Sequence, residues 1–279
     1  MVDLSSAPIE ADAIIALGAL VAGLVGALVG LGGGILVVPL LTVFLGVDVK
    51  QAMGASLLGV IATSTAAGAL RGTDPNCNHR VGILLETTAT IGAIAGALLA
   101  AVLHPAWLLI SFGSVLILSA LLSFRGARDP RPGELQPDRL AQQLRLDGAD
   151  YLVQRPVAGV ATMLGAGILS GLLGIGSGVL KVTAMDTLMR MPFRASTITS
   201  NFMIGITGAA GLGIYWHHGL IEPRIAGPTL AGVVPGAMLG AWLVRRVSVR
   251  LLRMVFLVVL LVVAGQMIYS GLHLERSTP

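Results

Sequence analysis

Two glycine clusters interrupt long apolar stretches of the chain, at residues 30–34 and 174–178. The apolar blocks around them, 13–45 and 157–189, are each too long for one ordinary membrane crossing of about 20 residues. Because glycine permits left-handed backbone and close approach, each cluster predicts a break in a helix. A helix that restarts near Ile35 or Val179 presents free N–H groups and a positive dipole end, and both favour an anion.

The residues at these breaks are therefore the first candidate site, a backbone cradle for a small anion. Its members are Gly32, Gly33, Gly34, Gly176, Ser177 and Gly178. Backbone leaves helical geometry at membrane depth only where protein or water satisfies its polar groups, which favours a binding site. The alternative is that the glycines only allow helices to pack closely.

Lys181 lies three residues beyond Gly178, inside a strongly apolar block. An ammonium group is expensive to bury and tends to mark a transport pathway or to find a partner. As a point charge it suits a small oxyanion, so we predict that Lys181 binds the anion. The alternatives are an ion pair with Asp186, five residues on, or a side chain that extends to the membrane surface.

Glu86 is the only acidic residue in the apolar blocks 81–103 and 106–124. A carboxyl group in that position could carry a proton and couple transport to a proton gradient. Alternatively, Glu86 lies near the membrane interface and offsets the charge of Arg80 or Arg71.

Ser56 and Ser200 occupy matched positions on the helices that follow the two breaks, and Asn201 adjoins Ser200. Their hydroxyl and amide groups can bind the oxygen atoms of an anion without adding fixed charge. The alternative is that they bond the preceding turn of their own helix or a neighbouring helix.

No pattern typical of an enzyme or of a cofactor site stands out. His217 and His218 are adjacent and so do not share a helix face, and no other His or Cys has metal-ligand spacing around them. Ser177 lacks the first glycine of a Gly-x-Ser-Gly arrangement, and the sequence has no phosphate-binding loop for ATP. We expect no enzyme activity, no cofactor and no metal.

The composition predicts a membrane protein with many helices in the lipid bilayer. Of the 279 residues, 55% are hydrophobic and only 11% are charged, and the mean hydropathy is +0.87. A soluble domain has roughly a quarter of its residues charged. The net charge is only +4, so a soluble enzyme and a nucleic-acid-binding protein are both excluded.

The sequence repeats with a constant offset of 144 residues, which relates the two glycine clusters and about 80 residues in total. Ser56 matches Ser200, and Thr63 matches Thr207. We predict two homologous transmembrane repeats, 1–124 and 157–279, joined by a linker at 125–156 that is rich in Arg and Pro.

The charge pattern indicates that the two repeats are inverted. Segment 100–109 has no Lys or Arg, whereas its partner 244–253 is rich in Arg, and positive loops favour the cytoplasm. We predict an all-α protein in which each repeat has a glycine-broken re-entrant helical hairpin and three spanning helices. The N-terminus is then outside and the linker is cytoplasmic.

The run from Gly30 to Leu40, Gly-Leu-Gly-Gly-Gly-Ile-Leu-Val-Val-Pro-Leu, resembles the signature of the TauE/SafE (TSUP) sulfite exporter family, as does the Ala-x-x-x-Ser of Ala52 to Ser56. The second half carries Gly-Ile-Gly-Ser-Gly-Val-Leu-Lys at 174–181 and Thr-Ser-Asn-Phe-Met-Ile-Gly at 199–205. The second half has Ser177 where the first has Gly33, and Lys181 where the first has Val37.

This resemblance implies passage of small sulfur-containing anions, such as sulfite or organosulfonates, across a membrane. We expect a secondary transporter that works by alternating access in the prokaryotic plasma (inner) membrane. The alternative is a passive anion channel with the same pore-lining residues. A homodimer is left open as the assembly.

Overall fold

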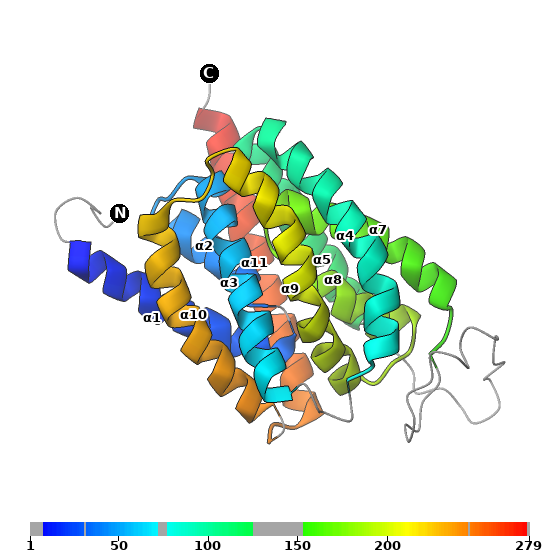
Figure 1. Ribbon diagram of the computed structural model, residues 1–279. Helices are drawn as coiled ribbons and strands as arrows, with labels where there is room; N and C mark the ends of the chain where they lie inside the picture. Colours follow the sequence, from blue (N-terminus) through cyan, green and yellow to red (C-terminus); the bar gives the residue numbers. More distant parts are fainter. Residues whose placement is uncertain (1–7, 31, 72–76, 125–152, 245, 278–279) are drawn as a thin grey trace.

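The computed structural model describes residues 8–30, 32–71, 77–124, 153–244 and 246–277. The predicted linker falls almost wholly outside these residues. Long helices from both halves of the chain lie side by side in one bundle (Figure 1). The elements of the first half are α1 (Pro8–Val29), α2 (Gly34–Pro39), the π-helical turn η1 (Leu40–Phe44), α3 (Val49–Arg71), α4 (His79–Val102) and α5 (Pro105–Phe124). Those of the second half are α7 (Pro156–Leu173), α8 (Gly178–Thr183), the π-helical turn η2 (Ala184–Leu188), α9 (Phe193–His217), α10 (Pro223–Leu243) and α11 (Val249–Ser277).

The elements of the two halves begin in the same register. The first residues of α2, η1, α3, α4 and α5 are 34, 40, 49, 79 and 105, and those of α8, η2, α9, α10 and α11 are 178, 184, 193, 223 and 249. Each pair differs by the 144 residues that relate the two sequences. The repeat in the sequence is therefore also a repeat in the order and spacing of helices.

The short helices α2 and α8 are the short arms of the two breaks. The helices that precede them, α1 and α7, are each followed directly by a glycine in left-handed conformation. The φ angles of Gly30, Gly32 and Gly33 are 80°, 75° and 74°. Those of Gly174, Gly176 and Ser177 are 66°, 72° and 57°. A serine therefore adopts at Ser177 a conformation that side chains disfavour.

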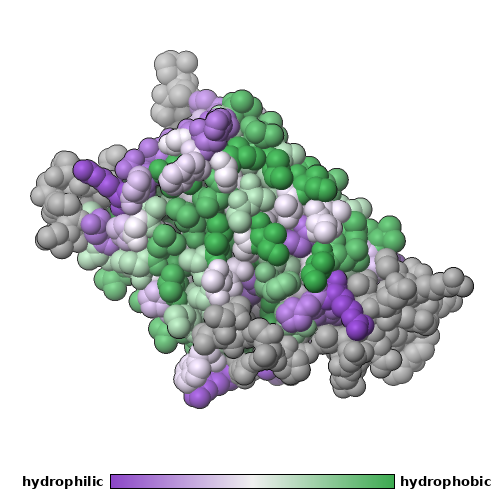
Figure 2. Space-filling model, viewed as in Figure 1, coloured by the Kyte–Doolittle hydropathy of each residue, from purple (hydrophilic) through white to green (hydrophobic). Residues whose placement is uncertain are grey.

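The helical arms on the two sides of each break are unequal. α1 and α7 each contain a stretch that is long and apolar enough to cross a membrane, whereas Gly34–Phe44 is a shorter apolar helix. Within the described residues, six helices have the length and composition of a membrane span: Ala11–Val29, His79–Val102, Pro156–Leu173, Phe193–His217, Pro223–Leu243 and Arg250–His273. Figure 2 shows hydrophobic residues over most of the middle of one face, with hydrophilic residues mainly towards its margins.

The first helix of each half packs against a helix of the other half, α1 against α10 and α7 against α4 (Figure 1). A Cβ atom added at Gly232 would lie 1.9 Å from the carbonyl oxygen of Ala16, and one at Gly96 would lie 1.9 Å from that of Ile168. Only hydrogen fits at these crossings, because the two backbones are in direct contact. The two halves are thus interlocked rather than placed side by side.

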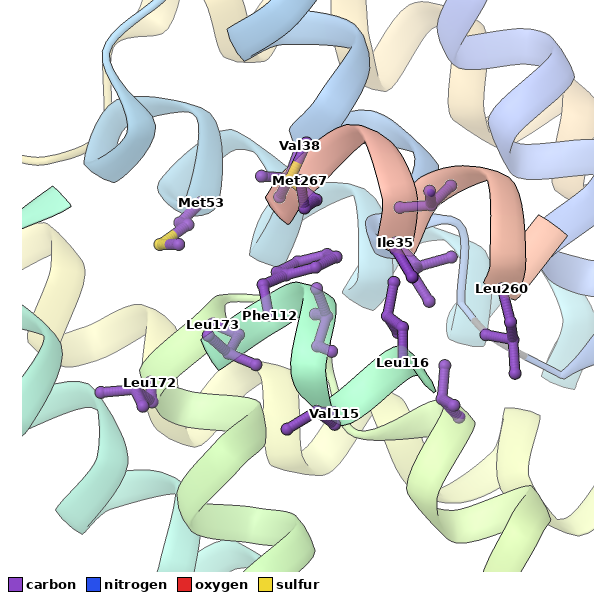
Figure 3. Packing of buried hydrophobic residues seen from close by; sticks show 14 of the residues in the cluster. Ile35, Val38, Met53, Phe112, Val115, Leu116, Leu172, Leu173, Leu260 and Met267 are labelled. Atoms are coloured by element: carbon purple, nitrogen blue, oxygen red, sulfur yellow. The ribbon is translucent and has the colours of Figure 1, made fainter. Parts of the chain in front are cut away.

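α5 and α11, which hold matched places in the two halves, pack against each other and cover the short arms from one side. Phe112 and Leu116 of α5, Leu260 of α11 and Ile35 of α2 belong to one apolar cluster (Figure 3). Leu173, at the end of α7, belongs to the same cluster. This apolar core holds both helix breaks against a common support.

We predict that Gly167→Ala, at the crossing of α7 and α4, lowers the free energy of unfolding by about 1–3 kcal/mol. A Cβ atom at Gly167 would lie 2.1 Å from the carbonyl oxygen of Ala89, so the helices must move apart. Gly165 is two residues away on the same helix, and nothing lies within 4 Å of its Cβ position. Gly165→Ala should therefore be neutral or stabilising by up to about 1 kcal/mol. Thermal unfolding in detergent measures both, and equal effects would contradict this account of the crossing.

Candidate functional site

The two helix breaks lie against each other in the interior of the protein. A Cβ atom at Gly34 would lie 3.3 Å from the Cα atom of Ile175, so the backbones of the two glycine clusters are in contact. Gly34 and Ile175 are both buried. The six residues predicted to form the backbone cradle therefore belong to one region of the fold, although 144 residues separate their two groups in the sequence.

Two reciprocal hydrogen bonds join the halves at this place. The hydroxyl of Ser56 on α3 donates to the carbonyl oxygen of Gly174 at 2.8 Å, and that of Ser200 on α9 donates to the carbonyl oxygen of Gly30 at 2.9 Å. Each serine thus bonds the break of the other half. Ser200 also reaches the carbonyl oxygen of Gly178 at 3.3 Å. These bonds agree with the alternative in which the serines bond a neighbouring segment of backbone, rather than the preceding turn of their own helix.

Five buried side-chain atoms have no hydrogen-bond partner among the described residues, and they are Ser170 Oγ, Ser177 Oγ, Arg194 Nε, Ser196 Oγ and Asn201 Oδ1. Ser177 lies in the second break itself, and Asn201 adjoins Ser200. Ser177 is 0% exposed and precedes the first residue of α8, where a serine side chain usually accepts a backbone N–H. It makes no such bond here. Asn201 uses its Nδ2 to donate to the carbonyl oxygen of Ala27 at 2.9 Å, which leaves Oδ1. Buried polar atoms are normally paired, so the Ser177 hydroxyl, which can donate, is available to an anion or to water, whereas Asn201 Oδ1 only accepts and calls for a donor such as water.

Two apolar side chains fill the space beside the breaks, Val60 on α3 and Ile204 on α9. A Cβ atom at Gly176 would lie 2.5 Å from Val60 Cγ1, and one at Gly32 would lie 2.5 Å from Ile204 Cδ1. Val60 and Ile204 are themselves 144 residues apart, and both are 0% exposed. The matched serines bond the breaks, and these matched apolar residues close the space around them.

Lys181 lies on α8, one helical turn beyond the second break, and its ammonium group has two partners. Lys181 Nζ is 2.6 Å from Glu86 Oε2 on α4 and 2.5 Å from Thr207 Oγ1 on α9. Thr207 Oγ1 donates in turn to Glu86 Oε1. All three side chains are buried, Lys181 at 0% exposure and Glu86 at 4%. We call these three residues the charged triad.

The charged triad differs from the structural alternatives that the sequence left open for Lys181 and Glu86, while anion binding by Lys181 and proton transfer by Glu86 stay predictions. The carboxylate that faces Lys181 is Glu86 rather than Asp186, and the lysine does not extend to the surface. Glu86 is buried, and the charged group that it contacts is the ammonium of Lys181. The sequence analysis treated Lys181 and Glu86 as separate candidates, and the fold brings them together.

Sequence reasoning missed Thr207, Val60 and Ile204 as members of this region. Thr207 was noted only as the match of Thr63, whose hydroxyl donates within its own helix to the carbonyl oxygen of Gly59 at 2.8 Å. The only signal that could have found the apolar pair is the constant offset between the halves. Among the described residues, no group of three or more His, Cys, Asp or Glu is arranged to hold a metal ion.

The apolar helices, their lipid-compatible surface and a polar cluster buried between them define an integral membrane protein with several spanning helices. The chain belongs to the sulfite exporter TauE/SafE family, whose sequence model matches residues 15–267. This confirms the resemblance carried by the glycine motifs. The family supports transport across the membrane, rather than catalysis, as the activity of this class of protein.

Curated relatives carry transporter names. The chain is 29% identical to the "Probable membrane transporter protein YunE" of Bacillus subtilis (strain 168) over 263 residues, which cover 91% of this chain and 96% of the relative. It is also 29% identical to a "Probable membrane transporter protein" of Xylella fastidiosa (strain 9a5c), over 89% of this chain and 93% of the relative. No solved structure matches the chain significantly.

Proposed function

We propose that the protein is a secondary transporter for a small anion, with sulfite or an organosulfonate as the substrate class. The observation that carries this proposal is the pair of helix breaks joined by the reciprocal bonds of Ser56 and Ser200. The helix starts at Gly34 and Gly178 adjoin the two breaks, and a helix start leaves N–H groups free and carries a positive dipole end. An oxyanion offers several acceptors for such donors, and the family's name supports a sulfur oxyanion.

The anion in this proposal is held by the backbone of Gly32, Gly33, Gly34, Gly176 and Gly178 and by five side chains. Ser177 supplies a buried hydroxyl that has no partner among the described residues. Ser56, Ser200 and Asn201 lie on the helices that position the breaks. Lys181, one turn further on, supplies the positive charge.

We infer that the two halves are inverted repeats, each with a re-entrant hairpin at its break. Elements that begin 144 residues apart, reciprocal serine bonds and the exchange of α1 and α7 between the halves all support a two-fold relation. The arginine bias supports opposite orientations, with the N-terminus outside and the linker in the cytoplasm of a prokaryotic cell. Alternating access then consists of one repeat moving against the other around the breaks.

The packing beside the breaks favours a transporter over an open channel. Val60 and Ile204 fill the space next to Gly176 and Gly32, so this arrangement has an apolar barrier at the proposed site. A transporter must close the site on at least one side at every stage, and a matched pair of apolar side chains is suited to that role.

Purified protein in liposomes tests the proposal, with uptake of sulfite, sulfate, thiosulfate, methanesulfonate and a carboxylate measured separately. We predict that Ser56→Ala and Ser200→Ala each lower uptake of the transported anion about 3- to 10-fold, since each loses one hydrogen bond of about 0.5–1.5 kcal/mol. Ser114→Ala is the control, because Ser114 is exposed and only bonds the carbonyl oxygen of Ile110 in its own helix. Uptake of cations or neutral solutes alone would refute the anion substrate.

A further inference from the structure

Lys181 does not present a free positive charge. Its ammonium group is 2.6 Å from Glu86 Oε2 and 2.5 Å from Thr207 Oγ1, in a fully buried position. The pair of Lys181 and Glu86 is electrically neutral, and Thr207 links the two by donating to the second carboxylate oxygen. An anion near Lys181 therefore competes with a carboxylate that is already in contact with the ammonium.

Among the residues that the structure describes, the other charged groups on the elements around Glu86 are distant along their helices or already engaged. α4 packs against α7 and α9, and α7 has no ionisable side chain between its ends. On α9, Arg194 and His217 are thirteen and ten residues from Thr207, which is about 20 Å and 15 Å along the helix. On α4 itself, His79 and Arg80 stand at the first turn. η2 carries the buried Asp186, which makes interactions of its own.

We propose that the proton is the co-substrate of this transporter, that Glu86 carries it, and that one proton crosses with each anion in the same direction. This proposal rests on the proposed function, because it assumes that an anion reaches Lys181. Removing the charge of Glu86 leaves Lys181 with an uncompensated positive charge in an apolar interior, which an anion neutralises. Neither the anion nor the proton is favourable there alone.

The step balances in charge and in atoms. On one side of the membrane, a proton from water binds an oxygen of the Glu86 carboxylate, and the O–H bond replaces the ion pair with Lys181. Lys181 keeps all three of its protons and donates to the anion. On the other side, the anion leaves, Glu86 returns its proton to water and the ion pair forms again. For a monoanion, no net charge crosses the membrane in one cycle.

Thr207 is a positioning residue in this step, because its hydroxyl contacts both Lys181 and Glu86. Its match in the other half, Thr63, has no charged partner at the corresponding positions, which are Val37 and Leu230. Among the described residues, the Thr63 hydroxyl bonds only the carbonyl oxygen of Gly59. The chain therefore contains its own control for the removal of this hydroxyl.

The test uses methanesulfonate, a monoanion that stays ionised over the whole working pH range and so cannot carry the proton itself. Liposomes that contain the wild-type protein and a trapped pH dye receive an inward methanesulfonate gradient with the membrane potential clamped at zero. We expect uptake of methanesulfonate together with internal acidification, at one proton per anion. An inward proton gradient is expected to drive uptake, and a change in membrane potential is expected to leave it unaltered.

Glu86→Gln separates coupling from binding. We expect this variant to exchange labelled for unlabelled methanesulfonate. Its rate of internal acidification should be at least tenfold below that of the wild-type protein. Thr207→Val is expected to lower the coupled uptake several-fold and to shift its dependence on pH, whereas Thr63→Val keeps both at the wild-type level. If Glu86→Gln does not fold, the comparison of Thr207→Val with Thr63→Val still tests whether the charged triad couples proton and anion uptake.

Two results would overturn different parts of this account. If the wild-type protein takes up methanesulfonate without acidification, or if uptake follows the membrane potential, the coupling is refuted and the transporter stands. If no anion of the panel enters through the wild-type protein, the proposed function itself is refuted and the coupling fails with it.

Discussion

Replacing Lys181 by methionine is expected to lower the free energy of unfolding by about 3–5 kcal/mol, since it leaves the buried carboxylate of Glu86 without its ammonium partner. Methionine has a similar length and fits an apolar surrounding, so lost volume contributes little. The carboxylate keeps only the hydroxyl of Thr207. Thermal unfolding in detergent should show this as the largest shift of any single side-chain replacement in the described interior.

The double variant Lys181→Met/Glu86→Gln distinguishes stability from transport. Removing both charges of a buried pair is often neutral or stabilising, so most of the lost stability should return. Anion uptake should stay at least tenfold below wild type, because the positive charge is missing. A Lys181→Met protein that is as stable and as active as wild type would contradict both the pairing as a structural element and the role of Lys181 in binding.

Gly174→Ala is expected to lower the free energy of unfolding almost as much as Lys181→Met does, because it disturbs the backbone of the second break. Gly174 has φ 66°, and its added Cβ atom would lie 2.8 Å from the carbonyl oxygen of Met53 and 2.9 Å from its Cα atom. The left-handed conformation costs about 1–2 kcal/mol and the overpacking about 1–3 kcal/mol. Since the carbonyl group of Gly174 also accepts from Ser56, we expect at least a tenfold loss of uptake beside the lost stability.

Gly33→Ser provides the matched control for this backbone effect. Gly33 also has a positive φ, of 74°, but the nearest atom to its Cβ position is the carbonyl oxygen of Ala22 at 3.3 Å. The equivalent residue of the other half is already a serine, Ser177. Gly33→Ser should therefore fold and transport within a few-fold of wild type. If Gly174→Ala and Gly33→Ser have equal effects on uptake and on thermal unfolding, close backbone packing at Gly174 does not explain the effect of Gly174→Ala.

The positions of the helix breaks and of the repeat could be predicted from the sequence because their signals are local. Glycine is the residue that adopts left-handed backbone easily, and Gly30, Gly32 and Gly174 do so in the structure. The constant offset of 144 residues predicted that Ser56 and Ser200 hold matched places, and their reciprocal bonds agree.

The charged triad could not be predicted, since its members come from three helices and no local pattern relates them. Lys181 and Glu86 are 95 residues apart in the chain, and Thr207 and Glu86 are 121 apart. Asp186 was the candidate partner of Lys181 only because it is near in sequence. Val60 and Ile204 are ordinary apolar residues by type, and only their contacts with the breaks set them apart.

The charged triad breaks the symmetry of an otherwise duplicated interior. Where the second break has Lys181, Glu86 and Thr207, the first has Val37, Leu230 and Thr63. Exchanging the roles of the two halves therefore does not return the molecule to an equivalent state. In the proposed alternating access, the outward-open and inward-open forms are not equivalent in free energy, so we expect empty carriers to accumulate facing one side and turnover to saturate at different concentrations in the two directions. We expect such a carrier to be faster in one direction than in the other, although the equilibrium it reaches is set by the gradients alone.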